Sequence, residues 1–349
     1  MKKKVLSMVL AGVMALSVAA CGSKPAATDT TAAGTAEAET ALEAVTDTSA
    51  EAGTEATEAA SGETYKIGVL QLVQHAALDA ANEGFFAALD EAGVKYEADQ
   101  QNASGEQSNC QTIAEKLVND GDDLILAIAT PAAQAVAGVT SDIPVILTAV
   151  TDPAESGLVE DNNVPGGNVT GTSDLTPVKE QIDLLQKLVP DAKTVGILFC
   201  SAESNSEIQA QLAREALDAA GIAHEDYTVS SSNEIQTVVE SMIGKVDAIY
   251  APTDNMIAAG MATVAMVAND NGIPTICGEA GMVEAGGLAT YGIDYYQLGY
   301  MAGEQAIDIL VNGKTAAETP IGYLPAERCE LTVNEETAQA LGIDTSVVK

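Results

Sequence analysis

The chain has 349 residues and a formal net charge of −36 at pH 7, with 51 acidic against 15 basic residues. A balance this acidic argues against nucleic acid as a partner, because phosphate backbones are bound by basic surfaces. Two histidines and five scattered cysteines without a CxxC pair provide no recognisable ligand set, so we expect no metal and no other cofactor.

The first 21 residues have the layout of an export signal. A basic start, Lys2–Lys4, precedes a mainly apolar run from Val5 to Ala20, and small residues lead directly into Cys21. The run is marginal for a membrane span, which needs about 20 apolar residues. We predict a signal peptide over residues 1–20 and lipidation of the Cys21 thiol, which becomes the new N-terminus. A transmembrane anchor with an incidental cysteine is the alternative.

The next segment, residues 21–64, is predicted to be a disordered acidic tether. Residues 22–63 contain no aromatic and almost no large aliphatic side chains, so they cannot bury enough surface to offset the entropy of ordering. Nine acidic residues and one lysine keep such a segment extended. We therefore expect an extracytoplasmic protein that is lipid-anchored to the cell membrane.

The folded part begins near Tyr65 and contains an internal repeat. The sequence KIGVL at Lys66–Leu70 matches TVGIL at Thr194–Leu198, and ALDEAG and ALDAAG follow at the same offset of 128 residues. Asp123 and Asp247, each before a short apolar run, continue the match at an offset of 124. Some 285 residues exceed the usual size of one core, so two lobes built from two copies of one module are predicted.

Each module is predicted to alternate strands and helices. Short apolar runs bounded by turn residues, at Ile67–Leu70, Leu124–Ala129 and Val145–Leu147, are typical of buried parallel strands. Capping-box patterns at Ser104–Gln107 and Ser204–Glu207 indicate helix starts, with Ser104 and Ser204 as the capping residues.

Two later helices bear on how the chain passes between the two lobes. Pro177 begins a helix with apolar residues on one face, which Pro190 ends. A helix over about 295–311 has no evident counterpart at the end of the first module, so we expect it to return the chain to the first lobe.

The predicted fold class is α/β, with two doubly wound parallel-sheet lobes and a ligand cleft between them, as in the type I periplasmic-binding-protein fold. The lobes are discontinuous in this prediction. Residues 65–172 and 295–325 form lobe 1, and residues 173–294 and 326–349 form lobe 2.

A ligand is expected where the carboxyl ends of the strands of both lobes face each other, because open α/β sheets bind ligands there and two lobes enclose them by hinge closure. The loops at these ends are rich in small hydroxyl and amide residues. They provide the candidate ligand-binding residues Gln71, His75, Thr130, Thr148, Ser204, Asn205, Asp254, Glu279 and Asp294.

These candidates suit an amino acid. Helix N-termini and the Thr130 and Thr148 hydroxyls would bind a carboxylate, and Asp254 would accept from an ammonium group, with Glu279 and Asp294 as rivals. Asp254 and Ser204 fit equally well as simple helix caps.

Aromatic residues leave a further choice open. Phe199, Tyr250 and Tyr291 end strands of the second lobe, where they would serve either as apolar walls for an aromatic ligand or as core. His75, just past the first strand, would contact ligand or simply complete its loop.

Several of these segments together resemble a known family. They are YKIGVLQ at Tyr65–Gln71, HAALD at His75–Asp79, GTSD at Gly171–Asp174, SNS at Ser204–Ser206 and PTDN at Pro252–Asn255. In this order they resemble the tryptophan/tyrosine-type substrate-binding proteins of ABC transporters, over nearly all of residues 65–345. The resemblance implies a type I binding fold without catalysis, an ABC permease and ATPase as partners, and an aromatic amino acid as a candidate ligand. Ala76 departs from the family's pattern, in which proline follows the histidine, and this leaves the pose of His75 open.

The sequence provides little for an enzyme. It has no G-x-S-x-G elbow, no phosphate loop and no histidine cluster, so no catalytic residues are expected. We predict a monomeric substrate-binding lipoprotein. The alternatives are a receptor of the same fold for a sugar or nucleoside, weakened by the absence of tryptophan, and a ligand sensor for a signalling receptor.

Overall fold

The computed structural model describes residues 62–349. The predicted signal peptide, Cys21 and nearly all of the predicted tether lie outside the described residues. Within residues 62–349, no helix is long and apolar enough to cross a membrane.

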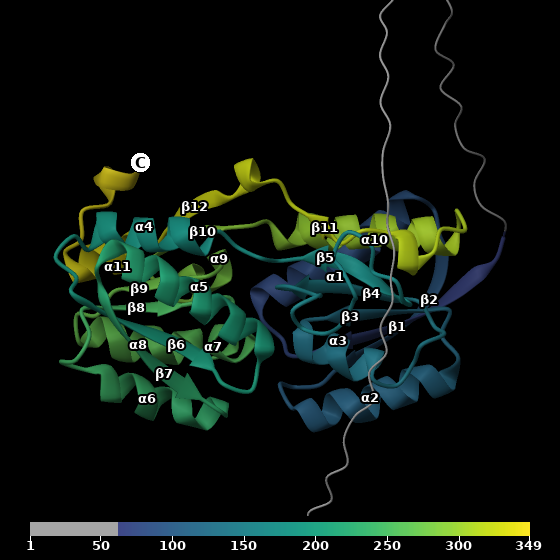
Figure 1. The fold of residues 1–349 in the computed structure, drawn as a ribbon, viewed down its shortest axis with the longest axis horizontal. Helices are drawn as coiled ribbons and strands as arrows, with labels where there is room; N and C mark the ends of the chain where they lie inside the picture. The colour runs from purple at the N-terminus through teal and green to yellow at the C-terminus, as the bar shows by residue number, and fades with distance from the viewer. Residues whose placement is uncertain (1–61) are drawn as a thin grey trace, which may run out of the picture. The chain divides into compact units, whose positions relative to one another are not determined.

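Two six-stranded sheets form the framework of the described region (Figure 1). The first sheet has the spatial order β11 (Gly322–Tyr323), β5 (Val169–Ser173), β4 (Val145–Val150), β3 (Leu124–Ile128), β1 (Thr64–Gln71) and β2 (Lys95–Asn102). The second has the order β12 (Glu330–Val333), β10 (Ala289–Gly292), β9 (Thr275–Cys277), β8 (Ala248–Ala251), β6 (Thr194–Cys200) and β7 (Ala223–Val229). All pairs are parallel except β10 with β12. The α/β fold class of two doubly wound sheets is confirmed.

The internal repeat is visible in both strand order and hydrogen bonding. The matched segments Lys66–Leu70 and Thr194–Leu198 lie in β1 and β6, which occupy the same position in their sheets. The Asp123 carboxylate accepts from the backbone N–H of Lys66 at 2.8 Å, and the Asp247 carboxylate accepts from that of Thr194 at 2.9 Å. The two halves thus join their first and third strands with the same side-chain contact.

Helices cover both faces of each sheet (Figure 1). On the first sheet, α1 (Ala76–Glu91) and α10 (Tyr295–Leu310) pair on one face, and α2 (Gln107–Asp120) and α3 (Thr130–Ala137) on the other. On the second, α4 (Val178–Leu188) pairs with α5 (Ser204–Ala220), and α6 (Ile235–Met242) with α8 (Met261–Asp270). Three short helices complete the second lobe: α7 (Asn255–Ala259), α9 (Ala280–Glu284) and α11 (Glu335–Leu341).

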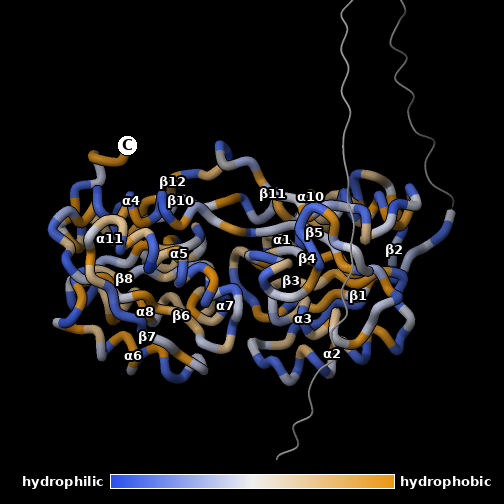
Figure 2. The backbone as a smooth tube through the Cα atoms, viewed as in Figure 1, coloured by the Kyte–Doolittle hydropathy of each residue, from blue (hydrophilic) through white to orange (hydrophobic). Residues whose placement is uncertain are grey.

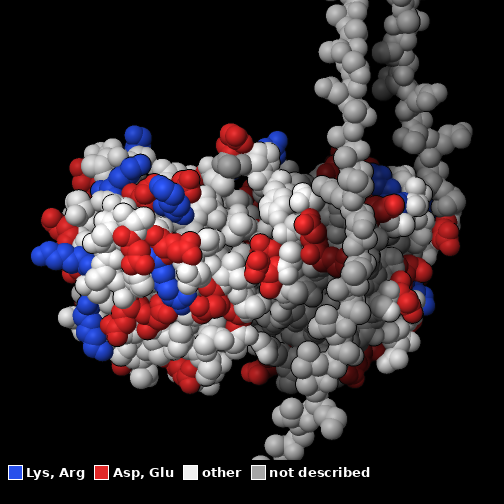
Figure 3. Space-filling model, viewed as in Figure 1, with Lys and Arg blue, Asp and Glu red and all other residues white. Residues whose placement is uncertain are grey.

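Apolar strands hold these layers together. Every residue of β3 and β4 is buried, and the hydrophobic backbone segments in Figure 2 run through the middle of each lobe. Full burial of a leucine or isoleucine contributes about 1.5–3 kcal/mol, so these strands supply much of the stability. Acidic side chains are spread over the face shown in Figure 3, in keeping with the charge of the chain.

The last helix of each half crosses to the other lobe. After β5 the chain enters α4, which packs on α5 and β10 of the second lobe. After β10 it enters α10, which packs on α1, β4 and β5 of the first. The expectation that α10 has no counterpart in the first half is therefore wrong, since α4 is that counterpart. The residue boundaries proposed for the lobes stay a prediction.

The contact between α1 and α10 depends on glycine. A Cβ atom on Gly299 would collide with the backbone carbonyl of Ala81, and one on Gly84 with that of Tyr296. Only residues without a side chain allow the two helix backbones to approach this closely.

The two capping boxes are wrong as predicted. Helix α2 begins at Gln107, after Glu106, and α5 begins at Ser204 itself, after Glu203, and in neither case does a side chain cap the helix. Ser104 instead has a left-handed backbone, with φ of 56°. The serine of the second pattern is the first helical residue because Glu203 takes the preceding place and turns its carboxylate toward α7.

Candidate ligand-binding site

A small cavity of about 10 Å³ lies at the junction of the two lobes, beyond the carboxyl ends of their strands. The first lobe contributes His75, Leu78 and Ala149 to it, and Asp174 and Tyr295 lie where the chain passes between the lobes. The second lobe lines it with Asn205, Thr253, Asp254, Asn255, Ala258 and Glu279. The position is the one expected for a ligand in facing α/β sheets.

Backbone strain gathers around this junction. The three residues other than glycine with positive φ in the described part are Ser104 (56°), Ala129 (85°) and Ala149 (56°). Ala149 lines the cavity, and Ala129 sits between β3 and the start of α3. An alanine in this conformation costs of order 1–3 kcal/mol, and such strain is concentrated at ligand sites.

Asp254 is both a helix cap and a wall of the cavity. Its carboxylate accepts from the backbone N–H of Ile257 at 2.8 Å, which caps α7, and from that of Cys200 at 2.5 Å. Only 1% of the residue is exposed, and burial raises the pKa of its carboxyl. Asp254 therefore caps a helix and lines the cavity at the same time, so the two roles predicted for it are compatible.

A second carboxylate, Glu203, lies beside Asp254. It accepts from the side-chain amide of Asn255 at 2.5 Å and from the backbone N–H of Met256 at 3.2 Å. Burial, and then the charge of Asp254, raise the pKa of Glu203 to about 8. Glu203 directly precedes the candidate Ser204, but sequence reasoning did not single it out, because its role depends on contact with a segment 52 residues away.

Glu279 has a similar environment. It caps α9 by accepting from the backbone N–H groups of Gly281 at 2.5 Å and Met282 at 2.9 Å. Burial raises its pKa to about 7. The structure thus places Glu279 in the same cavity as Asp254, its predicted rival as acceptor of an ammonium group.

Asp174 and Tyr295 form a buried pair at the crossings between the lobes. The Tyr295 hydroxyl donates to the Asp174 carboxylate at 2.8 Å, and the Thr151 hydroxyl donates to it at 3.1 Å. Burial raises the pKa of Asp174 to about 6. Asp174 ends the GTSD segment at the first crossing, which is the one sequence feature that could have added it to the site.

Three of the predicted site residues carry buried polar atoms without a hydrogen-bond partner in the described part of the chain: His75 Nδ1, Thr130 Oγ1 and Asn205 Oδ1. An unsatisfied buried group costs about 1–3 kcal/mol. Their gathering in the loops beyond the strand ends favours a ligand that supplies the missing partners.

Five predicted residues lie outside this cavity. Thr130, the first residue of α3, is not among the residues that line it. The Gln71 amide donates to Asp79 at 2.7 Å within the first lobe, and the Thr148 hydroxyl accepts from Thr172 at 3.0 Å. Ser204 lies at the rim, where its hydroxyl accepts from the Gln134 amide at 3.4 Å. Asp294 is exposed and caps α10.

The candidate aromatic walls belong to the second lobe's core. Tyr250 is fully buried and donates to Gln181 at 2.7 Å, and Phe199 is buried in the same apolar cluster. Tyr291 packs against that cluster and is half-buried. Tyr295, which sequence reasoning used only to begin a helix, is the aromatic residue that lines the cavity besides His75.

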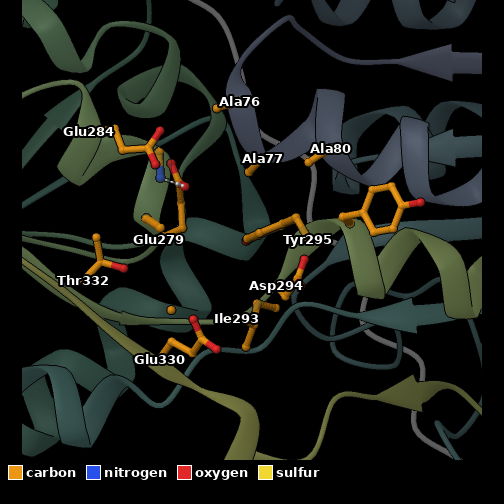
Figure 4. Close-up of a pocket in the computed structure, with 14 residues that line it drawn as sticks. Ala76, Ala77, Ala80, Glu279, Glu284, Ile293, Asp294, Tyr295, Glu330 and Thr332 are labelled. Carbon is orange, nitrogen blue, oxygen red and sulfur yellow. Dashed lines mark hydrogen bonds between the residues drawn. The ribbon is translucent and has the colours of Figure 1, made fainter.

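Two more pockets adjoin the cavity. One, shown in Figure 4, lies beside α1 and α9 and shares Glu279 and Tyr295 with the cavity; Glu284, Asp294 and Glu330 make it acidic. The other, between residues 104–108 and 230–233, shares Asn255 with the cavity. No group of three or more His, Cys, Asp or Glu side chains in residues 62–349 is arranged to hold a metal ion. Cys110, Cys200, Cys277 and Cys329 are free thiols.

The two lobes contact each other beside the cavity. The Gln107 amide of α2 donates to the Ala202 carbonyl at 2.8 Å, and the Gln209 amide of α5 donates to the Thr151 hydroxyl at 3.0 Å. The first bond lies in the adjoining pocket between residues 104–108 and 230–233, and the second lies next to Thr253, whose carbonyl also accepts from Gln209 at 3.3 Å.

Comparison with known proteins identifies the family. A family model described as ABC transporter substrate binding protein matches residues 66–347. The chain belongs to this family. A tyrosine-binding protein of Clostridioides difficile (strain R20291) is 43% identical over 279 residues, which are 79% of this chain and 80% of that protein. Members of the family bind a solute for an ABC importer outside the cytoplasm and typically are not enzymes.

Solved structures agree. The ABC domain in complex with L-Trp from Streptococcus pneumonia is 40% identical, with a TM-score of 0.79 over 82% of this chain and 98% of that one. The ligand-free, open structure of a substrate-binding protein with adhesive properties from Clostridium difficile is 41% identical, with a TM-score of 0.62 over 80% and 96%. A leucine-binding protein of Thermotoga maritima, 16% identical with a TM-score of 0.53, shares the fold.

Proposed function

We propose that this protein captures an aromatic amino acid and delivers it to an ABC permease and its ATPase. The carrying observation is the cavity between the lobes, where Asp174, Asp254 and Glu279 are buried. None of the eleven described residues that line it is lysine or arginine. Buried carboxylates without a cation are costly, so the cavity favours a ligand that brings one.

Relatives support an amino acid with an aromatic side chain. The 43% identical protein is named for tyrosine, and the 40% identical structure holds L-Trp. In this chain, the Tyr295 ring, Leu78, Ala149 and Ala258 provide apolar surface beside the carboxylates. The ammonium group would lie against Asp254 and Glu279, with the side chain on this surface.

The ligand carboxylate is assigned to the start of α3. Thr130 is the first residue of that helix, is fully buried, and has no partner for its hydroxyl among the described residues. Free backbone N–H groups at a helix start favour an anion, and the hydroxyl adds a donor.

Membrane attachment through Cys21 is part of this proposal. The basic and apolar residues before Cys21 and the acidic segment after it fit a lipoprotein held off the membrane by a tether. Replacing Cys21 by serine should move the mature protein from the membrane fraction to the medium or soluble fraction. Unchanged membrane association of that variant would contradict the anchor.

Calorimetry and thermal unfolding across the twenty amino acids test the ligand. Tyrosine or tryptophan should bind most tightly, and at about 100 times Kd the ligand should stabilise the protein by about 2.7 kcal/mol. Failure of every amino acid to raise the melting temperature would overturn the amino-acid assignment, and the same assay with nucleosides and sugars would then test the alternatives.

A further inference from the structure

The cavity wall offers hydrogen-bond acceptors and few free donors. Three of its residues are carboxylates, Asp174, Asp254 and Glu279, each with lone pairs beyond those already used. The Tyr295 hydroxyl, a donor on this wall, is committed to Asp174 at 2.8 Å. The orientations of Asn205 and His75 each add a further acceptor to this wall.

The side-chain orientation of Asn205 is fixed by its neighbours. Its Nδ2 lies 3.3 Å from Glu203 Oε2 and 3.4 Å from the Thr253 carbonyl oxygen. A carbonyl only accepts, so the amide N–H groups must face this side. Asn205 Oδ1 is then the atom left without a partner, and it is an acceptor in a residue that is 3% exposed and lines the cavity.

The tautomer of His75 follows in the same way. Asn255 Nδ2 donates to Glu203 at 2.5 Å, so Asn255 Oδ1 is the acceptor for His75 Nε2 at 3.4 Å. The proton therefore sits on Nε2, and burial lowers the pKa of His75, which favours the neutral ring. The unpartnered Nδ1 is thus a second buried acceptor.

We propose, building on the proposed function, that the site recognises its ligand by the ammonium group, and that aromatic monoamines without a carboxylate are a second class of ligand. An ammonium carries three donors and no acceptor, which complements this wall. A carboxylate brings only acceptors and a negative charge, so it gains nothing from the same surface. Its binding depends on Thr130 and the start of α3, away from the carboxylates.

The inference is tested on the unmodified protein by calorimetry with L-tyrosine, tyramine and N-acetyl-L-tyrosine. Tyramine should bind within about tenfold of L-tyrosine, and N-acetyl-L-tyrosine should bind at least about 100-fold more weakly, since it loses the charged donor. Binding of L-tyrosine with loss of tyramine by more than about 100-fold would overturn the inference and leave the proposed function intact. The L-tryptophan, tryptamine and N-acetyl-L-tryptophan set gives the same decision if tryptophan is the tighter ligand. Binding of neither amino acid would instead overturn the proposed function.

A paired substitution sharpens the test. Asp254→Asn retains a residue that caps helices well and removes the charge, so it should weaken L-tyrosine and tyramine by the same factor, about 10–100-fold. Asp344→Asn, at an exposed helix cap of the second lobe, is the matched control and should change neither. Weakening of L-tyrosine alone by Asp254→Asn would contradict recognition through the ammonium group.

Discussion

The two lobes are copies of one module, yet they line the cavity between them with different chemistry. The first lobe presents His75, Leu78 and Ala149, none of which carries a negative charge. The second presents Asp254 and Glu279, with Glu203 just behind them. The strands retain the repeat, down to the paired contacts of Asp123 and Asp247. Duplication has therefore kept the framework, and the loops after the strands have diverged to give the cavity its polarity.

The largest effect on binding is expected when the Asp254 carboxylate is removed from the second lobe. Asp254→Ala should weaken amino-acid binding by more than about 100-fold, because it deletes a buried acceptor for the ammonium. Calorimetry measures the loss, and circular dichroism shows whether the fold survives removal of the α7 cap. Unchanged affinity in a folded variant would remove Asp254 from the site.

A smaller loss is expected from the first lobe. Thr130→Val keeps the shape of a fully buried residue and removes a hydroxyl that has no partner in the described structure. Affinity for L-tyrosine should fall by about 5–10-fold, and unfolding stability should barely change, because no intramolecular bond is lost. A larger loss of affinity from Thr130→Val than from Asp254→Ala would contradict this comparison, because the first lobe would then provide the stronger ligand contact.

Acidification should weaken binding through the same carboxylates. Burial raises the pKa of Asp174 to about 6 and that of Glu279 to about 7 in the ligand-free protein. A bound ammonium favours their ionised forms, so binding releases protons, and affinity should fall by up to about tenfold per pH unit for each proton released below these values. Calorimetry in buffers of different ionisation enthalpy measures the release directly. Affinity that is flat from about pH 8 to about pH 5.5 would contradict it.

Stability of the ligand-free protein should follow the opposite trend. Between the ordinary pKa of a carboxyl, about 4.5, and about 7, the folded protein binds more protons than the unfolded chain. The melting temperature should therefore rise as the pH is lowered through this window. A melting temperature that falls with acidification there would mean that these carboxyls are not buried in the ligand-free state.

The smallest expected effect concerns closure of the cavity. Gln107→Ala removes the bond between α2 of the first lobe and the Ala202 carbonyl of the second, in the pocket beside the cavity. Affinity should fall by about two- to fivefold, through faster dissociation, because an exposed neutral hydrogen bond contributes about 0.5–1.5 kcal/mol. Stopped-flow measurement distinguishes this from a change in association, and Gln111→Ala, one turn further along the same helix, is the matched control.

The sequence predicts the framework well because strands and repeats leave local patterns. The apolar runs at Ile67–Leu70 and Leu124–Ala129, and the offset of 128 residues, are readable without a structure. The second capping box failed because Glu203 follows a distant contact with Asn255 rather than its local pattern. The role of α4 was missed because periodicity identifies a helix but not the sheet on which it packs.

The residues around the cavity also divide into those that a local pattern indicates and those that depend on distant contacts. His75, Asn205, Asp254 and Glu279 lie in loops that topology places at the strand ends, so the sequence is enough to propose them as candidates, and the structure places all four around one cavity. Asp174 and Tyr295 join the cavity from the crossings between the lobes, where the local sequence gives no sign of burial. Gln71 and Thr148 lie at the expected edge, but neighbouring side chains already satisfy them.

The exchange of α4 and α10 between the lobes bears on how such a chain could have arisen and how it can be cut. A contiguous half, such as residues 62–190, contains five strands of one sheet but carries a final helix that covers the other. Expressed alone, that half would expose the face on which α10 normally packs and would have no partner for α4. Two copies could satisfy each other by trading their last helices. We expect such a fragment to form a domain-swapped homodimer, which makes the present chain resemble that dimer fused end to end.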